Sequence, residues 1–541
     1  MTDSMQQMAL DTLGAYFGYT SFRPGQDRMV DAILAGRDAL GVMPTGAGKS
    51  ICYQVPALML PGITFVVSPL LSLMEDQTRA LLAAGARPSY LNSSLTPAQQ
   101  NTVLKRAREG RYQLMYVAPE RLLEPRFLAF AQEAAADGGI GVPLVAIDEA
   151  HCVSQWGQDF RPAYLQIREF IDSLPQRPIV AAFTATATER VRADIQQMLG
   201  LQNPATVVTG FDRKNLYFGC EEMGDKAKTA WVRDYVIAHS SESGIVYCST
   251  RKTVDALAGE LAEALGPSGI RVGRYHAGMG NDARRQSQRA FIDDDIQVMV
   301  ATNAFGMGID KPNVRFVIHY NMPKDLESYY QEAGRAGRDG QPSRCTLLYS
   351  GTDVRTIRFF IDKELEADNG LPADVKAEAA HKAEERLKYM TFYSTTPKCL
   401  RGFLLEYFGE AAPKKCGNCS CCLAAEQEAQ LQLETSRRRA ADNAHRLEKP
   451  RRTKSTAGAA PLSEADEKLL NALYARRKWL AGKQNVPAFM VFSDATLREM
   501  VEKKPLSLDE LLNISGVGEK KAARYGTTFL RIIEDAVENR E

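Results

Sequence analysis

The chain has 541 residues and a formal net charge of +1, because 67 Lys and Arg stand against 66 Asp and Glu. This balance excludes a protein that attracts nucleic acid through its overall charge, so any such site must be a local patch. The length predicts roughly three or four domains. The lack of an apolar run of about 20 residues and of a signal-peptide pattern predicts a cytoplasmic protein without a membrane span.

The first 350 residues contain short apolar, β-branched runs that alternate with stretches of helical pattern. Strands interleaved with helices are typical of parallel sheets covered on both faces. Two such series, divided near residue 210, predict two α/β domains in tandem, over residues 1–208 and 209–350. The runs lie at 63–68, 114–118, 144–147 and 179–183, and then at 244–249, 296–302, 314–320 and 345–349.

A glycine-rich segment, Met43-Pro-Thr-Gly-Ala-Gly-Lys-Ser50, follows the expected strand 38–42 and precedes helix-compatible sequence. This is the context of a phosphate-binding loop, in which backbone N–H groups and a lysine hold phosphates and a hydroxyl binds Mg²⁺. Met43 stands where the strict pattern has glycine, so a turn that only starts a helix remains the alternative. The predicted ATP-binding residues are Thr45, Gly46, Gly48, Lys49 and Ser50.

The segment Ala146–Pro162 joins two kinds of chemistry. Asp148 and Glu149 end an apolar strand, where an Asp can hold Mg²⁺ and a Glu can orient the attacking water. The following polar loop carries Trp156, Phe160 and Arg161, residue types that stack on bases and contact phosphates. The combination predicts a motor that couples nucleotide hydrolysis to nucleic-acid binding; the alternative is that Trp156 fills an interdomain crevice.

Two arginines in the segment Ser328–Gly340 are spaced three residues apart, at Arg335 and Arg338. On a helix or turn this spacing brings both guanidinium groups to one side. Arginines across a cleft from a phosphate loop can stabilise charge on the transferred phosphoryl group, and we therefore predict a catalytic role for both. An Arg-Gly repeat is also common on surfaces and in RNA-binding segments.

Residues 351–424 have a helical pattern and end in a cysteine cluster. Clustered thiols in a reducing cytosol predict a metal site, and thiolate ligation favours Zn²⁺ in a structural, tetrahedral site. Five thiols compete for four positions, and a redox role is the alternative. The cluster consists of Cys399, Cys416, Cys419, Cys421 and Cys422.

The remainder divides into a polar segment and a helical one. Residues 425–461 are predicted to be a basic, flexible linker, in which 437–454 holds eight Lys and Arg and forms either a solvated tether or a weak DNA contact. Residues 462–541 are predicted to be a small all-α domain.

Together these motifs resemble those of the RecQ family of superfamily-two DNA helicases over residues 10–425. The resemblance implies two RecA-like domains, with Arg338 as the arginine finger and Arg335 beside it at the nucleotide. It assigns Trp156, Phe160 and Arg161 to a loop that senses single-stranded DNA. The segment 17–26 resembles the adenine-recognition motif and 301–310 a nucleotide-cleft motif, which adds Tyr19, Arg23, Gln26 and Asp310 to the predicted ATP site.

The resemblance also interprets the C-terminal third. It implies Cys399, Cys416, Cys419 and Cys422 as zinc ligands, with Cys421 spare, and residues 462–541 resemble an HRDC domain. Many relatives carry a winged-helix domain after the zinc site. Here fewer than 40 residues separate Cys422 from the HRDC-like region, which is too short and too polar for that domain.

The resemblance implies an ATP- and Mg²⁺-dependent 3′-to-5′ DNA helicase of DNA repair and recombination. Its expected partners are single-stranded and forked or branched DNA, with a single-stranded-DNA-binding protein as a further candidate; a monomer is expected, associated with the nucleoid if bacterial. The alternative is an ATP-driven translocase or branched-DNA remodeller that unwinds duplex weakly. A DNA binder with an inactive ATPase and an RNA helicase are less consistent with the motifs.

Overall fold

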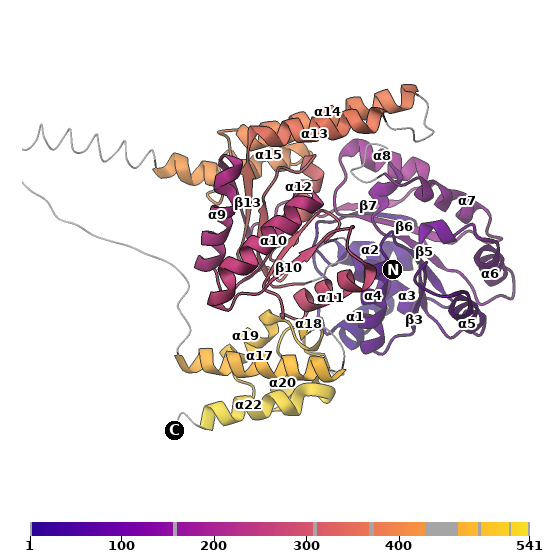
Figure 1. Cartoon of the computed structure of the whole chain (residues 1–541). Coiled ribbons are helices and arrows are strands. Elements are labelled where there is room, and N and C mark those ends of the chain that lie inside the picture. Colours follow the sequence, from indigo (N-terminus) through magenta and orange to yellow (C-terminus); the bar gives the residue numbers. More distant parts are fainter. Residues whose placement is uncertain are drawn as a thin grey trace, which may run out of the picture.

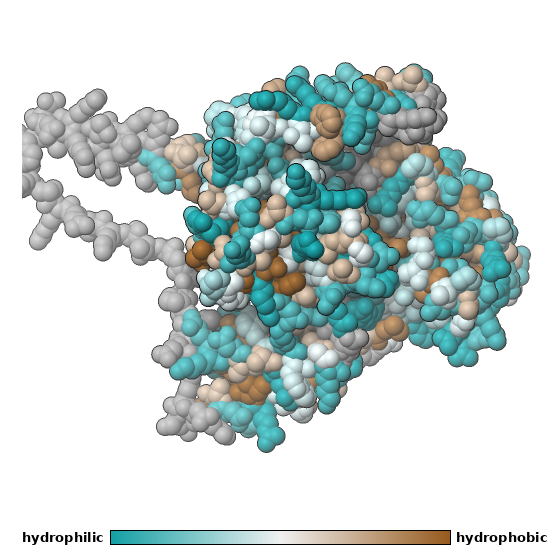
Figure 2. Space-filling view, in the orientation of Figure 1, coloured by the Kyte–Doolittle hydropathy of each residue, from teal (hydrophilic) through white to brown (hydrophobic). Residues whose placement is uncertain are grey.

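The computed structural model describes residues 3–154, 160–306, 311–366, 373–427, 464–484, 488–518 and 521–538. Two α/β lobes lie side by side, with helices α13, α14 and α15 along one side of them and the C-terminal helices along the opposite side (Figure 1). The exposed face in Figure 2 is mostly hydrophilic, with hydrophobic side chains in small separate patches. Among the described helices, none combines the length and apolarity needed to cross a bilayer.

The first lobe is a seven-stranded parallel sheet in the order β3-β4-β2-β5-β6-β1-β7. The inner strands β1, β2, β4 and β5 are buried along their whole length because helices cover both faces. The strands are β1 Ala39–Val42, β2 Thr64–Val67, β3 Pro88–Leu91, β4 Leu114–Val117, β5 Leu144–Ile147, β6 Ile179–Thr184 and β7 Ala205–Val208. The helices are α1 Asp3–Phe17, α2 Gln26–Leu34, α3 Lys49–Met59, α4 Leu71–Ala83, α5 Pro97–Arg108, α6 Pro125–Ala135, α7 Gln166–Asp172 and α8 Glu189–Met198.

The second lobe is a six-stranded parallel sheet in the order β10-β11-β9-β12-β13-β8. Gly244 of β9 lies opposite Phe316 of β12, and a Cβ at Gly244 would come within 2.0 Å of that ring, so the two strands pair closely only because residue 244 is glycine. The strands are β8 Leu216–Glu222, β9 Ser243–Tyr247, β10 Val272–Tyr275, β11 Val298–Ala301, β12 Val314–His319 and β13 Ser343–Tyr349. The helices are α9 Asp225–Ala238, α10 Arg251–Leu265, α11 Asn281–Ile292 and α12 Leu326–Ala333.

The predicted fold class, two tandem parallel α/β domains followed by helices, is confirmed. The four strands absent from the predicted runs are β3, β7, β8 and β10. All four are edge strands, since β3 and β7 end the first sheet and β10 and β8 end the second. Edge strands are exposed on one side, so their sequences carry weaker apolar runs, and β3 even begins with Pro88, which an edge tolerates.

Helices follow the second sheet. They are α13 Gly351–Glu366, α14 Ala373–Thr395 and α15 Leu400–Tyr407, and then, in the C-terminal domain, α17 Glu464–Gln484, α18 Ala488–Val491, α19 Asp494–Lys503, α20 Leu508–Leu512 and α22 Thr527–Glu538. The C-terminal domain has its own core, which includes Leu473, Val491, Phe492, Leu497 and Phe529. Of the predicted linker, residues 425–427 are helical and 428–461 lie outside the described residues.

The C-terminal domain contacts both lobes. Lys478 of α17 forms an ion pair of 2.8 Å with Asp295 of the second lobe. On the first lobe, a Cβ at Gly518 would lie 2.9 Å from the Cα of Gly18, so the two backbones approach closely because both residues are glycine. The domain therefore bridges the lobes on the side opposite α13 and α14 (Figure 1).

Candidate active site and metal centre

Two of the predicted motifs and the end of strand β6 meet at one edge of the first sheet. The phosphate loop follows β1, the Asp148-Glu149 pair follows β5, and Thr184 ends β6. These strands are neighbours, in the order β5-β6-β1. Because carboxyl ends of parallel strands lie at the same edge, residues far apart in sequence come together there, which is where open α/β sheets bind ligands.

The phosphate loop takes its shape from two glycines. Gly46 and Gly48 have φ of 82° and 79°, the left-handed region that glycine enters without strain. Lys49 begins α3, and its ammonium donates to the Met43 carbonyl at 3.3 Å. The Met43 side chain, only 1% exposed, packs in the core. A methionine in place of the first glycine therefore anchors the loop to the sheet and leaves its phosphate-facing part to Gly46 and Gly48.

The segment predicted to recognise adenine contacts this loop directly. Gln26 is buried, and its amide nitrogen donates to the carbonyls of Ala47 at 2.9 Å and Gly48 at 3.1 Å. The Arg23 guanidinium donates to the Gly46 carbonyl, while Tyr19 is exposed. Sequence reasoning assigned Gln26 to the base alone and missed its contact with the loop, which depends on how α2 packs beside α3.

The two carboxylates differ in environment. Burial is the main cause that raises the pKa of Asp148 to about 7; the charge of Glu149 raises it further and Lys49 opposes the rise. Glu149 has a φ of 48°, and its Oε2 atom is buried without a hydrogen bond, 3.4 Å from the nearest ring nitrogen of His151. A buried carboxyl with a raised pKa and a second acid beside it fit a divalent cation, whose charge would favour the ionised form.

A hydrogen-bonded chain joins these acids to the neighbouring strand. The Nδ1 atom of His151 lies 2.9 Å from the Thr184 hydroxyl, which in turn donates to the Thr186 carbonyl at 3.0 Å. The Tyr164 hydroxyl donates to the Asp148 carbonyl at 2.9 Å. These contacts connect the predicted hydrolytic pair to residues 184–186 at the end of β6.

The predicted DNA-sensing loop is described only at its end. Trp156 lies outside the described residues, whereas Phe160 and Arg161 are half-buried. Arg161 donates from its guanidinium to the Pro69 carbonyl at 3.2 Å, which joins the loop to the segment after β2. The roles of these residues in DNA binding stay predictions.

The second lobe brings both predicted arginines to the cleft, in turns after α12 rather than on a helix. Arg335 is buried, donates to the Gly306 carbonyl, and lines a cavity of about 80 Å³ together with Glu149 and His151. Arg338 abuts the phosphate loop, since a Cβ at Gly46 would lie 3.4 Å from its Cγ. Asp310 lies outside the described residues.

One residue of the site was missed by sequence reasoning. Arg213, in the segment between the sheets, donates to the Thr45 carbonyl of the phosphate loop at 2.6 Å and to the carbonyls of Ala336 and Gly337 at 2.9 and 2.8 Å. The Thr45 hydroxyl itself donates to the Gly334 carbonyl at 2.9 Å. In the sequence, the only indication of this role was that Arg213 lies in the short segment between the two α/β domains.

The cysteine cluster forms a compact group. The sulfur atoms of Cys399, Cys416, Cys419 and Cys422 all lie within 4.8 Å of one another. The fifth thiol, Cys421, instead donates to the Thr396 carbonyl at 3.4 Å. Four convergent, largely buried thiols without a carboxylate fit a tetrahedral zinc ion, and the geometry separates Cys421 from its neighbour Cys422.

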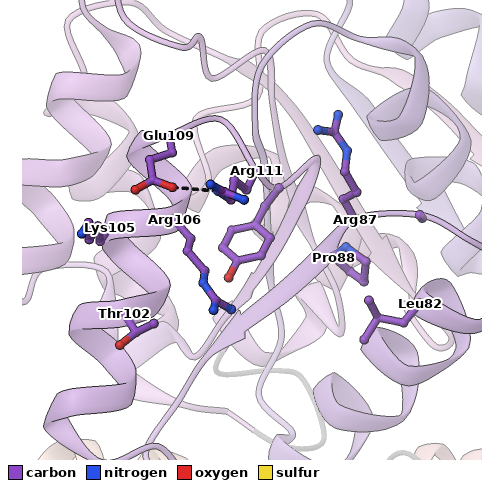
Figure 3. Close-up of a pocket in the computed structure, with 10 residues that line it drawn as sticks. Leu82, Arg87, Pro88, Thr102, Lys105, Arg106, Glu109 and Arg111 are labelled. Carbon is purple, nitrogen blue, oxygen red and sulfur yellow. Dashed lines mark hydrogen bonds and ion pairs between the residues drawn. The ribbon is translucent and has the colours of Figure 1, made fainter.

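A larger cavity, of about 740 Å³, lies elsewhere in the first lobe. Arg87 and Pro88 stand at the start of β3, and Arg111 and Tyr112 precede β4. In Figure 3 cationic side chains surround the cavity, and Glu109 pairs with Arg111 at 2.7 Å. Because it lies at the amino ends of the strands, opposite the motif residues, it is not the nucleotide site.

Four family models match the chain in succession. They are the DEAD/DEAH box helicase at residues 23–195 and the helicase conserved C-terminal domain at 227–340. The RecQ zinc-binding family then matches 351–423 and the HRDC domain 466–533.

Similar curated proteins match over nearly the whole chain. The ATP-dependent DNA helicase RecQ of Bacillus subtilis is 40% identical over 98% of this chain and 99% of its own. That of Pasteurella multocida is 36% identical over 98% of this chain and 94% of its own. The Bacillus alignment spans 607 positions against 541 residues here, so at least 66 positions of the relative have no counterpart.

Solved structures share the fold of the two lobes. The DEAD-box helicase Mss116 bound to ssRNA and UDP-BeF covers 70% of this chain and 80% of its own, with a TM-score of 0.54 at 16% identity. The Mycobacterium smegmatis helicase Lhr bound to ssDNA and AMP-PNP covers 71% of this chain and 57% of its own, with a TM-score of 0.51 at 17% identity.

Proposed function

The chain belongs to the RecQ family of ATP-dependent DNA helicases, and we propose that it couples ATP hydrolysis to 3′-to-5′ movement along single-stranded DNA and to duplex unwinding. The observation that carries the proposal is the approach of Arg338 in the second lobe to Gly46 in the first. An arginine held against the phosphate loop from across a cleft can act only when both lobes close, so hydrolysis and domain movement are coupled.

The geometry of the cleft supports a set of proposed roles in hydrolysis. Lys49 and the backbone of Gly46 and Gly48 hold the phosphates, and Tyr19, Arg23 and Gln26 bind the adenine end. Glu149, with its unsatisfied buried oxygen, orients the attacking water, while Arg335 and Arg338 stabilise the developing charge. Ser50 and Asp148 would hold Mg²⁺, which would supply positive charge to neutralise the charge that develops during hydrolysis.

The contact between His151 and Thr184 supports a coupling route. A shift of Glu149 or His151 on hydrolysis alters the 184–186 turn, and Arg161 connects the strand-sensing loop to Pro69. We infer that binding of single-stranded DNA at Trp156, Phe160 and Arg161 signals to the acid pair through this chain. Trp156→Ala should then abolish stimulation of the ATPase by DNA while ATP binding persists; retained stimulation would contradict this role.

The proposals on oligomeric state, DNA substrate, partner and location rest on membership of the family. We propose a monomer that acts on single-stranded and forked or branched DNA in repair and recombination, with a single-stranded-DNA-binding protein as a partner. The proposed location is cytoplasmic, at the nucleoid in a bacterial cell. Zinc held by the four convergent cysteines would have a structural role, since four thiolates complete a tetrahedral site and leave no open position.

A second candidate function rests on length. The relative from Bacillus has at least 66 aligned positions without a counterpart here, and the segment after Cys422 is too short for a winged helix. If that module is absent, the chain translocates or remodels branched DNA but unwinds long duplex weakly.

Strand displacement separates the two functions. The substrates are a fork with a 3′ overhang, a fork with a 5′ overhang and a long blunt duplex, and Lys49→Ala is the inactive control. Unwinding of the 3′ fork alone supports the helicase with the proposed polarity. Remodelling of a branched junction without displacement of the fork favours the second function, and equal ATPase stimulation by RNA would refute the DNA assignment.

A further inference from the structure

A single guanidinium connects the two faces of the nucleotide cleft. Arg213 lies between β7 of the first lobe and β8 of the second. One of its terminal nitrogens donates to the Thr45 carbonyl at 2.6 Å and to the Gly334 carbonyl at 3.3 Å. The other donates to the Ala336 and Gly337 carbonyls. Arg213 therefore holds the phosphate loop with one nitrogen and the turn between Arg335 and Arg338 with the other.

The contacts are to backbone atoms, so they fix chain position and not only side chains. Asn215 adds a hydrogen bond from its amide to the Gly337 carbonyl at 2.9 Å. A Cβ at Gly337 would lie 2.5 Å from that amide nitrogen, and one at Gly334 would lie 2.1 Å from the Thr45 hydroxyl. The turn thus carries glycine at the two points where the interdomain segment and the phosphate loop press against it.

The residue type suits this role. A guanidinium is planar and presents five N–H donors in a fixed fork, whereas a lysine ammonium is a compact group on a flexible stem. Only the fork can reach carbonyls on both sides at once with good geometry. These partners are also neutral, so Arg213 acts by holding two backbones together and not by neutralising a carboxylate.

The zinc-binding subdomain in turn holds Arg213. Arg401 of α15 donates to the Arg213 carbonyl at 2.7 Å, to the Asp212 carboxylate at 2.6 Å, and to the Leu216 carbonyl. Arg401 is buried. Just ahead of it, the Cys399 sulfur caps α15 by accepting the Gly402 N–H at 3.3 Å, so the cysteine centre sets the start of the helix that carries Arg401.

A second contact secures the same segment. Glu410 accepts the Phe211 N–H at 2.7 Å, and the rings of Phe211 and Phe408 stack with centroids 4.4 Å apart. Residues 211–216 are therefore held by hydrogen bonds on both sides. Arg213 bonds to the cleft, and Arg401 and Glu410 bond to the segment from the zinc-binding subdomain.

We propose that Arg213 is a positioning residue that keeps the phosphate loop and the arginine turn in register across the cleft, and that Arg401 of the zinc-binding subdomain holds Arg213 in place. The inference rests on the proposed ATPase function. It assigns the zinc-binding subdomain a part in hydrolysis. The position of Arg335 and Arg338 relative to the phosphates depends on residues 211–216, which the subdomain holds in place.

If Arg213 is a positioning residue, its loss should lower kcat but leave the affinity for ATP nearly unchanged. ATP binding uses Lys49, Gln26 and the loop, all in the first lobe, and survives without Arg213. Turnover needs Arg338 at the γ-phosphate, and a small misplacement of a catalytic group costs on the order of 10- to 100-fold in rate. Arg213→Gln should therefore lower kcat of the DNA-stimulated ATPase on the order of 10- to 100-fold, with the Kd for a fluorescent ATP analogue within about threefold of wild type.

Arg213→Lys should lower kcat of the DNA-stimulated ATPase as much as Arg213→Gln does, because a lysine keeps the charge but lacks the forked set of donors. The matched control is Arg177→Gln. Arg177 also donates to backbone carbonyls, of Pro178 and Gly200, and pairs with Asp38, but all these partners lie in the first lobe. Its loss should lower the Tm while kcat stays within about twofold of wild type. A kcat for Arg213→Gln no lower than that of Arg177→Gln would overturn the proposal.

The link to the subdomain is tested with Arg401→Gln, after zinc analysis has confirmed one ion per chain. Arg401→Gln should lower kcat by roughly threefold to tenfold, and the double variant should be no slower than Arg213→Gln alone, since both act through one segment. Multiplicative losses in the double variant would overturn the link. Wild-type protein without any DNA-stimulated ATPase would instead refute the proposed function, so the two failures are distinguishable.

Discussion

The nucleotide cleft and the cysteine centre are both candidate metal sites, but they are assembled in different ways. The cleft combines residues from Gln26 to Arg338 and from two lobes, whereas the cysteine centre draws all its thiols from residues 399–422. The cleft therefore depends on the packing of sheets and on the segment around Arg213. The cysteine centre depends mainly on local chain geometry and on the ion that it binds.

The largest effect is expected at the cysteine centre. Cys419 is fully buried within the set of four, and binding energies on the order of 10 kcal/mol support small zinc sites. Cys419→Ser should lose the zinc and unfold the subdomain. Cys421→Ser should retain both, because the Cys421 thiol bonds to Thr396.

The measurements are zinc content per chain and thermal unfolding. Equal zinc loss in the two variants would show that Cys421 takes part in ligation, and the centre would then be less strictly local than the geometry indicates.

A large effect on catalysis, with little on folding, is expected in the cleft. Arg338→Ala removes the guanidinium of the side chain whose Cγ abuts Gly46, and arginine fingers contribute on the order of 10³-fold to turnover. We expect kcat of the DNA-stimulated ATPase to fall by about that factor while the Tm changes little, because the side chain is only half-buried. A fall of less than about tenfold would mean that Arg335 supplies most of the charge.

The raised pKa of Asp148 distinguishes the cleft from the cysteine centre, because ionising this buried carboxyl costs free energy unless a cation lies nearby. Its pKa is about 7 in the folded chain, against about 3.9 unfolded. The folded state binds this proton more tightly, so the contribution of Asp148 to stability is greatest below pH 4 and is lost as pH rises through about 7, by as much as about 4 kcal/mol.

Urea unfolding at pH 5 and pH 8 in a metal chelator tests this expectation. Asp148→Asn should be stabilised relative to wild type at pH 8 more than at pH 5, and Mg²⁺ with a nucleotide should reduce the difference. An equal difference at both pH values would contradict the assignment of the titration to Asp148.

The smallest effect is expected where distant segments meet at the surface. The ion pair between Lys478 and Asp295 leaves about half of each side chain exposed, 54% and 50%, and exposed pairs contribute about 0.2–1 kcal/mol. Lys478→Glu should weaken docking of the C-terminal domain slightly, and added Asp295→Lys should restore it. Hydrogen exchange of the backbone amides of α17 is the readout; no recovery in the double variant would exclude a direct charge interaction.

The sequence by itself determined the chemistry of both regions and the fold class. The phosphate loop, the Asp148-Glu149 pair and the cysteine spacing are contiguous segments, and phosphate and metal binding demand those residue types in that order. Apolar runs divided by helical stretches sufficed for the parallel sheets, since strands buried on both faces must be apolar throughout.

The tertiary structure alone decided how these segments meet. It brought Arg213 between the phosphate loop and the arginine turn, placed the Gln26 amide on the phosphate loop, and turned Cys421 toward Thr396 and away from the other four thiols. Each of these contacts depends on the direction in which a side chain leaves a packed backbone. Local sequence patterns record burial and periodicity but not that direction, because it is set by the packing of elements that lie 21 to 168 residues apart in these contacts.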